Sequence, residues 1–525
     1  MAFRQPIRDT SKMPLALTSS HTFPAVSVAA VLVFILLRLT ILSPKARLRA
    51  HLARLPILNG SASGEEKRKA FLETAHQLYQ AGYQKFKDEA YRMPTSDDVE
   101  NVVIPPKFMR DLRTLPDSDL NFYPAAEKIL ESKYTGVLTD LSSVAYSVRA
   151  ELTPALARLN PIVYDEVDHA LKHDMPECTE WTPVPMYMTI AHMVAKITGR
   201  VFVGEGLCRS PEYLDNAINY AVDVHTAQVE VKRMSPLLRP FLAPRLASVR
   251  RLRRREAAAA RFFEPLVQSR LDAERSGDPD WRAPDDMLSV LMRKSEGRGI
   301  VSAAEMAKIQ LGIIFASVHT TSDMYDLAVR PEYMAPLREE IRGVLAAHGG
   351  EMTARGLQQM LKLDSFMKES LRLSPPLTTT FHRVVGRRGL ALPNGQHVPP
   401  GATVELASRA IVSDPAWHQG DADPAVFDGL RHYRRRTRPG AGAADHARHQ
   451  FVASHEQSLA FGYGRHACPG RFFAANELKM LLARLILEFD FKNADGSTER
   501  YPNIEIGPLI APDEHKDLLF KRVKT

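Results

Sequence analysis

Apolar residues recur mostly at helical spacing from about residue 65 to the carboxyl terminus, and this pattern constrains the fold more than any other feature. In the stretch RKAFLETAHQLYQAGYQKF, one helix face carries Phe71, Ala75, Leu78 and Tyr79. The same spacing predicts further helices over 138–158, 186–202, 211–232, 245–274, 302–328, 334–347, 354–372 and 471–488. Short extended segments fit 381–385, 396–400 and the carboxyl-terminal DLLFKRV. The sequence therefore predicts a mainly α fold with a small β part and no repeat architecture.

The composition is that of an ordinary globular chain, with 45% apolar and 25% charged residues. The formal net charge is +8, but the basic residues are not interleaved with a stacking platform or a Cys/His zinc array. No nucleic-acid partner is therefore expected. The run RRLRRRE at 250–256 is interpreted as a solvated helix face, with an anionic membrane or a partner protein as the alternative. The segment 434–449 is interpreted as an irregular surface loop.

An apolar stretch near the amino terminus, residues 23–42, has the length of a membrane-spanning helix, which needs about 20 apolar residues. Basic residues are somewhat denser after it than before it, which predicts a cytosolic location for the bulk of the chain. The predicted organisation is a lumenal tail (1–22), a transmembrane anchor (23–42), a basic linker (43–64) and one folded domain (65–525). The alternative for 23–42 is a buried core helix.

Three cysteines are too few for a disulfide framework and are typical of a reducing compartment. Cys178 and Cys208 have no His or Cys at metal-ligand spacing, so we expect both to be buried as small apolar side chains. Cys468 differs because it stands in the segment FGYGRHACPG, directly before a strongly apolar helix. The unpaired N–H groups and dipole of a helix amino terminus favour a thiolate, and Pro469 suits the first turn. The alternative is a thiol that is merely buried.

The residues around Cys468 fit a large, flat and anionic ligand. Phe461 can shield the sulfur, and Arg465 or His466 can supply a positive charge beside it. Close approach of the backbone to such a ligand is allowed by Gly462, Gly464 and Gly470. Haem, which carries two propionates, satisfies each of these features.

Two further clusters lie upstream. Glu369 and Arg372, in SFMKESLRLSPP, are three residues apart on one helix face and can form an ion pair, although such pairs are usually solvated. The apolar stretch AKIQLGIIFASVHTTSDM ends in a polar group that includes His319 and Thr320. Hydroxyl side chains in a helix often bond back to their own backbone, which is the alternative interpretation here.

The segment around Cys468 resembles the haem-binding loop of cytochromes P450, whose pattern is matched by Phe461, Gly464, His466, Cys468 and Gly470. The resemblance implies a cytochrome P450 fold after the anchor, with haem b and Cys468 as its axial ligand. It also implies that Glu369 and Arg372 form a buried triad with Arg431, which supports the haem loop. Propionate contacts are expected from Arg149 and Arg383, with His466 at a position where Arg is commoner; the usual Trp near Arg149 is replaced by Ala145.

The polar group at 316–321 resembles the oxygen-activating helix of that family, in which Thr320 would steady dioxygen and relay protons. Two positions depart from the family pattern, since Ser317 replaces a Gly and His319 replaces an acid. An imidazole can still transfer protons, so we expect His319 and Thr320 to be catalytic. The nine residues between Thr321 and Pro331 make this helix one or two turns shorter than expected.

The motifs of the chain resemble those of fungal P450s of secondary metabolism, including the ent-kaurene oxidase-like type. This resemblance implies a membrane-bound monooxygenase of the endoplasmic reticulum, with a cytosolic catalytic domain at 65–525 and a small lipophilic, terpenoid-like substrate. Its electrons would come from an NADPH–cytochrome P450 reductase, with cytochrome b5 as a further donor, and its oxidant would be O2. Substrate contacts are expected from 121–133, Ala316, 378–381 and 506–510. The alternatives are an oxygen-independent haem-thiolate isomerase or dehydratase, and an inactive haem-binding protein with a shortened helix.

Overall fold

The computed structural model describes residues 43–58, 64–296, 302–317, 322–417 and 423–524. The chain forms two compact units, Met1–Arg54 and Leu55–Thr525. In the first unit, α2 (Pro44–Leu52) is capped by Ser43, whose hydroxyl oxygen accepts a hydrogen bond from the Ala46 N–H at 3.1 Å. Among the described residues no helix combines the length and the apolar character needed to cross a bilayer. The predicted anchor at 23–42 lies outside the described residues.

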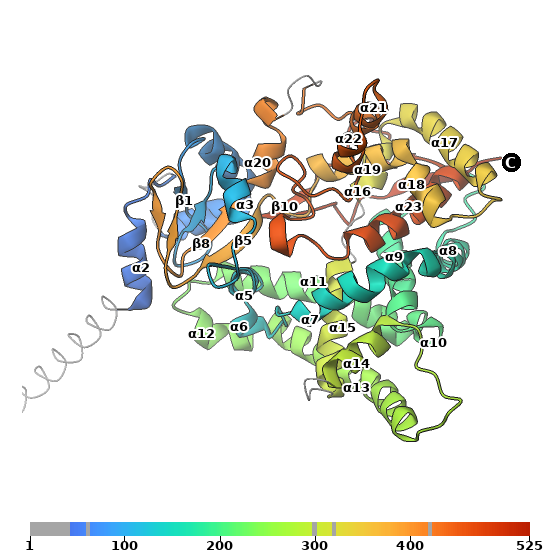
Figure 1. The fold of residues 1–525 in the computed structure, drawn as a ribbon, viewed down its shortest axis with the longest axis horizontal. Helices are drawn as coiled ribbons and strands as arrows, with labels where there is room; N and C mark the ends of the chain where they lie inside the picture. The colour runs from blue at the N-terminus through green and yellow to red at the C-terminus, as the bar shows by residue number, and fades with distance from the viewer. Residues whose placement is uncertain (1–42, 59–63, 297–301, 318–321, 418–422, 525) are drawn as a thin grey trace, which may run out of the picture. The chain divides into compact units, whose positions relative to one another are not determined.

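The second unit is mainly helical, as predicted (Figure 1). Its helices are α3 (Gly64–Lys85), α4 (Met109–Leu112), α5 (Tyr123–Ile129), α6 (Ser132–Thr135), α7 (Ser142–Ser147), α8 (Thr153–Asp174), α9 (Met186–Phe202), α10 (Glu205–Cys208), α11 (Pro211–Arg233), α12 (Arg239–Leu242), α13 (Ala247–Arg275), α14 (Met287–Glu296), α15 (Ala303–Ser317), α16 (Ser322–Ala328), α17 (Met334–Ala347), α18 (Ala354–Gln359), α19 (Leu361–Leu373), α20 (Ser408–Val412), α21 (Arg431–Thr437), α22 (Ala443–Arg448) and α23 (Arg471–Glu488).

Four small sheets accompany these helices in the part of the chain that the structure describes. The largest has the strand order β1 (Tyr91–Met93), β2 (Asn101–Val103), β8 (Thr403–Leu406), β5 (Thr380–Val385) and β3 (Leu120–Asn121). A second has the order β4 (Thr182–Val184), β12 (Leu518–Arg522) and β9 (Phe489–Asn493). The two-stranded sheets are β6 (Leu390–Ala391) with β7 (His397–Val398), and β10 (Ile504–Ile506) with β11 (Leu509–Ala511). Pairing is antiparallel except between β2 and β8.

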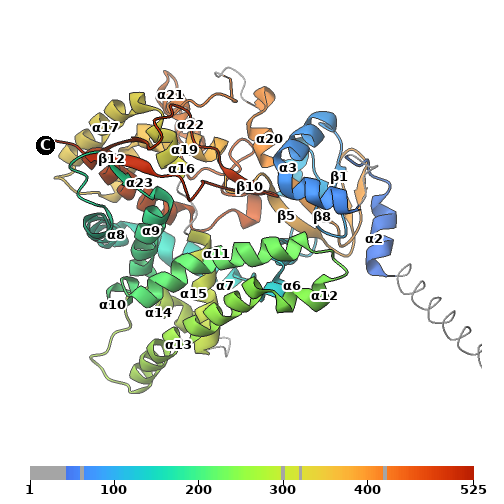
Figure 2. The same cartoon turned by 180° about the vertical axis from the view of Figure 1, so that it is seen from behind.

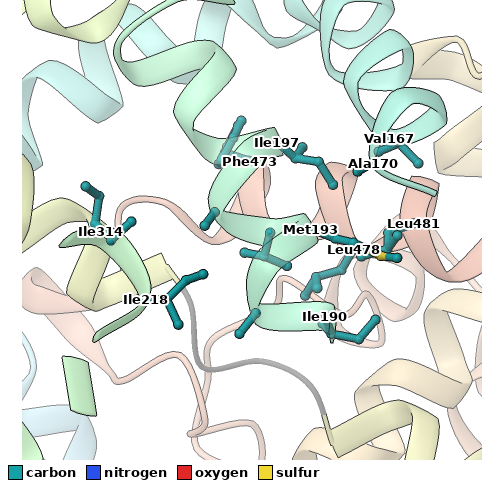
Figure 3. Packing of buried hydrophobic residues seen from close by; sticks show 14 of the residues in the cluster. Val167, Ala170, Ile190, Met193, Ile197, Ile218, Ile314, Phe473, Leu478 and Leu481 are labelled. Carbon is teal, nitrogen blue, oxygen red and sulfur yellow. The ribbon is translucent and has the colours of Figure 1, made fainter. Parts of the chain in front are cut away.

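The core is built from long helices that pack side by side. Helix α13 packs along α11 and α15, and α8 packs along α9 (Figure 2). Ile190 and Met193 of α9 lie beside Leu478 and Leu481 of α23 (Figure 3). All four side chains are buried, and their contacts fix α23 against α9. The helical spacing of the apolar residues in both sequences accounts for these contacts.

A π-helical turn, η2 (Val148–Leu152), separates α7 from α8 within the predicted helix 138–158. The N–H of Thr153 donates to the carbonyl of Val148, five residues earlier, and the next residue, Pro154, has no N–H to continue an α-helical ladder. This turn carries Arg149, whose side chain is exposed.

The structure differs from the predicted elements at three places. The helix expected at 354–372 is divided between α18 and α19, because Met360 is non-helical and the Glu340 carboxylate accepts hydrogen bonds from the N–H groups of Lys362 and Leu363. The segment 434–449, expected to be a loop, instead includes the end of α21 and the whole of α22. The helix expected at 302–328 is described as α15 and α16, with 318–321 outside the described residues.

The basic run at 250–256 is only partly a solvated face. Arg251 and Arg255 both bind the buried carboxylate of Asp223 on α11, at 2.5 and 2.6 Å. The run therefore ties α13 to α11.

Candidate active site

The segment 461–470 forms a compact loop before α23. The Cys468 N–H donates to the Phe461 carbonyl at 2.8 Å, and Gly462 and Gly464 have φ values of 75° and 71°. Glycine is required at 464 because a Cβ there would lie 2.6 Å from the Arg113 carbonyl oxygen. The loop therefore reverses direction within a few residues and brings Cys468 to the start of α23.

Cys468 is partly exposed, and its sulfur accepts hydrogen bonds from the backbone N–H groups of Gly470 and Arg471. Burial raises the pKa of the Cys468 thiol, although these N–H groups and the charges of Arg471 and Arg149 act in the opposite direction. As predicted, the N–H groups at the start of the helix act in favour of the thiolate, while burial acts against it. The N–H donors are present, but they do not outweigh burial, and coordination to a cation would be needed to hold the charge.

His466 is half-buried and bound to an acid. Its Nε2 lies 2.7 Å from Oδ1 of Asp117, and its ring stacks on Phe122 with centroids 5.3 Å apart and an interplanar angle of 25°. Burial lowers the pKa of His466, while the hydrogen bond to Asp117 raises it. Tyr123 meets the same ring edge-on at 5.7 Å. The ring is thus fixed by contacts on two elements far from it in sequence.

Arg383 is a buried cation on β5. The guanidinium donates to the His382 carbonyl at 2.7 Å and lies over the rings of Phe381 and Phe122, at 4.6 and 5.3 Å from their centroids. Among the described residues no carboxylate lies within 4 Å of it. Burial lowers the pKa of Arg383 to about 10, and the charge of Asp117 offsets part of this effect. A buried guanidinium in this state fits an anionic group from a ligand.

A bulge in β5 sets the direction of Arg383. The pairing of β5 with β8 changes register between Thr380 and Arg383, and Phe381 has a φ of 59°. Positive φ is costly for an aromatic residue and is found where the surrounding structure demands it. Such bulges redirect neighbouring side chains, here beside the loop that carries His466.

Arg149 approaches the same loop from the π-helical turn. Its Nη2 donates to the carbonyl of Arg465 at 3.2 Å. A Cβ atom added at Gly470, two residues after Cys468, would meet no described atom within 4 Å, so there is open space beside this residue. A sulfur, two guanidiniums, a histidine and an open glycine therefore border one region, and these donors fit the iron and the carboxylates of haem.

The predicted triad is confirmed. Arg372 donates to both carboxylate oxygens of Glu369 at 2.9 and 2.8 Å, and Nε of Arg431 donates to the same carboxylate at 3.2 Å. Glu369 is 0% exposed, Arg372 6% and Arg431 2%, so this is a buried charge cluster rather than a solvated pair. It joins α19 to α21, upstream of the cysteine loop.

Comparison with known proteins decides what this arrangement is. The sequence profile of the cytochrome P450 family matches residues 123–517. The chain belongs to the cytochrome P450 family. It is 33% identical over 503 residues to cytochrome P450 monooxygenase TES1 of Alternaria alternata, covering 94% of this chain and 93% of that protein. It is 36% identical over 438 residues to cytochrome P450 monooxygenase ATR3 of Stachybotrys chlorohalonatus, covering 82% and 90%.

A further similar protein is an ent-kaurene oxidase of Gibberella intermedia, which is 32% identical over 451 residues, covering 84% of this P450 and 82% of the oxidase. Members of the family are haem-dependent monooxygenases that bind iron through a cysteine thiolate. This P450 is therefore a monooxygenase of the type found in fungal secondary metabolism.

The two predicted catalytic residues of this P450, His319 and Thr320, lie outside the described residues. Three of the four segments predicted to contact substrate are joined in the structure. The Thr378 N–H donates to the Pro508 carbonyl at 2.8 Å, which links 378–381 to the β10–β11 hairpin, and Asn121 of β3 pairs with Val384 of β5. The fourth, Ala316, is the penultimate residue of α15.

Sequence reasoning missed Asp117, and it placed Phe122 only within the predicted substrate segment 121–133, not against His466. Both lie in LPDSDLNF, which has no recognisable motif, and Asp117 is 349 residues from the histidine that it binds. No local pattern could have joined them.

Proposed function

We propose that this P450 binds haem b with Cys468 as the axial thiolate and oxidises a small, lipophilic, terpenoid-like secondary metabolite. The observation that carries the proposal is the juxtaposition of two unusual groups. A cysteine whose sulfur accepts two backbone N–H groups lies at one end of the loop. Beside the loop's histidine lies the buried guanidinium of Arg383, which has no carboxylate within 4 Å among the described residues. One ligand with a metal centre and peripheral carboxylates would satisfy both.

The roles of the chain's residues follow from their contacts. The N–H groups of Gly470 and Arg471 stabilise negative charge on the Cys468 sulfur, and Phe461, whose carbonyl accepts the Cys468 N–H, shields it from water. The cations Arg383 and Arg149, together with His466, would hold the two carboxylates of the cofactor.

When bound, haem supplies electron transfer and dioxygen activation, so that substrate R–H, O2, two electrons and two protons give R–OH and water. Thr320 and His319 are the groups proposed to pass those protons, Thr320 through its hydroxyl and His319 through its imidazole. The two electrons would be supplied by an NADPH–cytochrome P450 reductase, with cytochrome b5 as a further donor.

A location on the endoplasmic reticulum membrane is part of the same proposal, with 23–42 as the single anchor and the catalytic domain in the cytosol. An exposed apolar cluster around α12 supports contact with lipid. Leu237 is 82% exposed, Leu238 50%, Phe241 66% and Leu242 42%. Exposed apolar side chains gathered in six residues are costly in water and are accommodated at a lipid interface.

The iron ligand is tested by the absorption of the reduced, carbon monoxide-bound protein. Wild-type protein should give the long-wavelength Soret band of a thiolate ligand, and Cys468→His should move it to the shorter wavelength of an imidazole ligand. Cys208→Ser, at a buried cysteine whose Sγ donates to the Glu205 carbonyl at 3.5 Å, is the matched control and should keep the wild-type band. A wild-type spectrum without the thiolate band would contradict the proposal.

The reaction is tested with purified reductase, NADPH and isotopically labelled dioxygen. We expect terpene hydrocarbons to gain one labelled oxygen atom, and Thr320→Ala to lose most of this turnover. Full product formation by Thr320→Ala, or product without labelled oxygen, would instead support an oxygen-independent isomerase or dehydratase. Normal haem binding without any turnover would support an inactive haem protein.

A further inference from the structure

Asp117 introduces a negative charge into a region that is otherwise arranged for the carboxylates of a ligand. It lies in the turn between α4 and β3, where the N–H groups of Asp119 and Leu120 both donate to the Pro116 carbonyl, at 2.9 and 3.0 Å. The end of β5 fixes this turn, because the Gly386 N–H donates to the Asp119 carbonyl at 2.8 Å. The position of Asp117 is therefore set by the same strand that carries Arg383.

His466 depends on Asp117 for its orientation. The bond from Nε2 to Asp117 is the ring's hydrogen bond within the described part of the chain, and its other contacts are the faces and edges of Phe122 and Tyr123. An imidazole without a polar partner can rotate about its Cβ–Cγ bond at little cost. Asp117 thus selects one ring orientation, the one stacked on Phe122.

Phe122 links His466 to Arg383, the buried cation that is proposed to bind a carboxylate of haem. Its ring contacts both His466 and the guanidinium of Arg383, the latter at 5.3 Å from the ring centroid. We name Asp117, His466, Phe122 and Arg383 the Asp117 stack. Within it, the carboxylate also attracts the buried guanidinium electrostatically.

We propose that Asp117 is a positioning residue for haem, which acts through His466 to hold the stack in the arrangement that binds the cofactor. This inference rests on the proposed function and deepens it, because it assigns a role to a carboxylate that does not touch the sulfur. A purely local ion pair would behave differently. With Asp117 39% exposed, such a pair contributes little to folding and nothing specific to haem.

The test is a double-mutant cycle on the haem-loaded, full-length protein. The rate of haem transfer to excess apomyoglobin is measured for wild type, Asp117→Asn, His466→Phe and the double variant. His466→Phe keeps an aromatic ring for stacking but removes the hydrogen bond. We expect Asp117→Asn to release haem several-fold faster than wild type. Its effect should be much smaller when His466 is already Phe, where only the attraction for Arg383 remains to be lost.

Two additional variants separate positioning from a general structural effect. Asp117→Glu, which keeps the charge, should restore slow release, and Asp117→Asn should move the haem reduction potential to more positive values because a nearby negative charge is lost. Asp119→Asn is the matched control, since Asp119 is in the same turn and pairs with exposed Arg388 at 3.0 Å. Its haem release should equal that of wild type.

Equal effects of Asp117→Asn in both backgrounds, or no effect in either, would overturn the inference. If Asp117→Asn cannot be purified with haem, Asp117→Glu decides, because release as fast as in His466→Phe would also overturn it. A wild-type protein without the thiolate Soret band would remove the proposed function, and this inference with it. A normal band combined with an additive cycle would remove this inference alone.

Discussion

Replacing Glu369 with Gln removes a negative charge that two buried guanidinium groups share. The carboxylate accepts two hydrogen bonds from Arg372, one from Arg431 and one from the Asp428 N–H at 3.1 Å. Gln keeps the shape of the side chain. Its amide nitrogen, however, is a donor that would face the donors of a guanidinium, and its oxygen carries no full charge.

Removing one partner from a buried ion pair costs about 3–5 kcal/mol, because the remaining charge stays buried without compensation. The unit Leu55–Thr525 has roughly 470 residues, and unfolding entropy of about 2.1 cal/mol/K per residue gives roughly 1 kcal/mol per degree. Glu369→Gln should therefore lower the midpoint of thermal unfolding by roughly 3–5 °C. The triad joins α19 to α21, upstream of the cysteine loop, and family resemblance implies that it supports that loop; haem should therefore be released below that midpoint.

The assay is thermal unfolding of the haem-loaded protein, followed by circular dichroism for the helices and by Soret absorbance for the cofactor. Asp272→Asn is the matched control, because Asp272 and Arg275 form an exposed i, i+3 pair at 3.8 Å with side chains 62% and 71% exposed. That variant should change stability by about 0–1 kcal/mol. If Glu369→Gln costs no more than Asp272→Asn, the triad does not carry the energy assigned to it.

Three further predictions concern other parts of the protein. Arg383→Met should stabilise the haem-free protein, because burial lowers the pKa of Arg383 to about 10, a shift that corresponds to roughly 3 kcal/mol at most. The same variant should lose haem faster than wild type. Equal destabilisation of the haem-free and haem-loaded proteins in thermal unfolding would contradict this. Burial raises the pKa of Glu477 to about 8, and its carboxyl bonds only to Thr198 among described groups, at 2.8 Å. The folded protein therefore keeps a proton that the unfolded chain has lost, so wild-type stability should fall as pH rises from about 4.5 to about 8. Glu477→Gln should remove this part of the fall, and an unchanged pH profile of unfolding would refute the assignment. Leu237→Ser with Phe241→Ser should weaken binding of the chain without its predicted anchor to phospholipid vesicles in a sedimentation assay; undiminished binding would exclude the apolar cluster as a lipid contact.

The sequence predicted best those features that depend on neighbouring residues. Helix α9 occupies the range predicted from apolar spacing, 186–202, because the residues of its buried face recur at helical intervals in the sequence. The pair Glu369 and Arg372 follows from helix geometry, whereas the partnership with Arg431 came from family resemblance and is confirmed by the structure.

Features that depend on distant residues could not be predicted. The break between α18 and α19 is made by Glu340 on α17, whose carboxylate caps a helix two elements later. Asp117 and His466 meet only because two loops converge. The segment 434–449 is interpreted from its sequence as a loop, but Asp445 binds the Gly442 N–H at 3.2 Å and starts the short helix α22.

The different exposure of the three cysteines offers a way to count the protein molecules that lack metal. Cys178 and Cys208 are buried, and burial raises the pKa of both thiols, that of Cys208 to about 12. Burial raises the pKa of Cys468 as well, but Cys468 is the partly exposed cysteine of the three, so alkylating reagents should reach it first under native conditions. Coordination to iron would use the same sulfur. Mass spectrometry after brief alkylation would then give the fraction of molecules without metal, one covalent mark for each empty site.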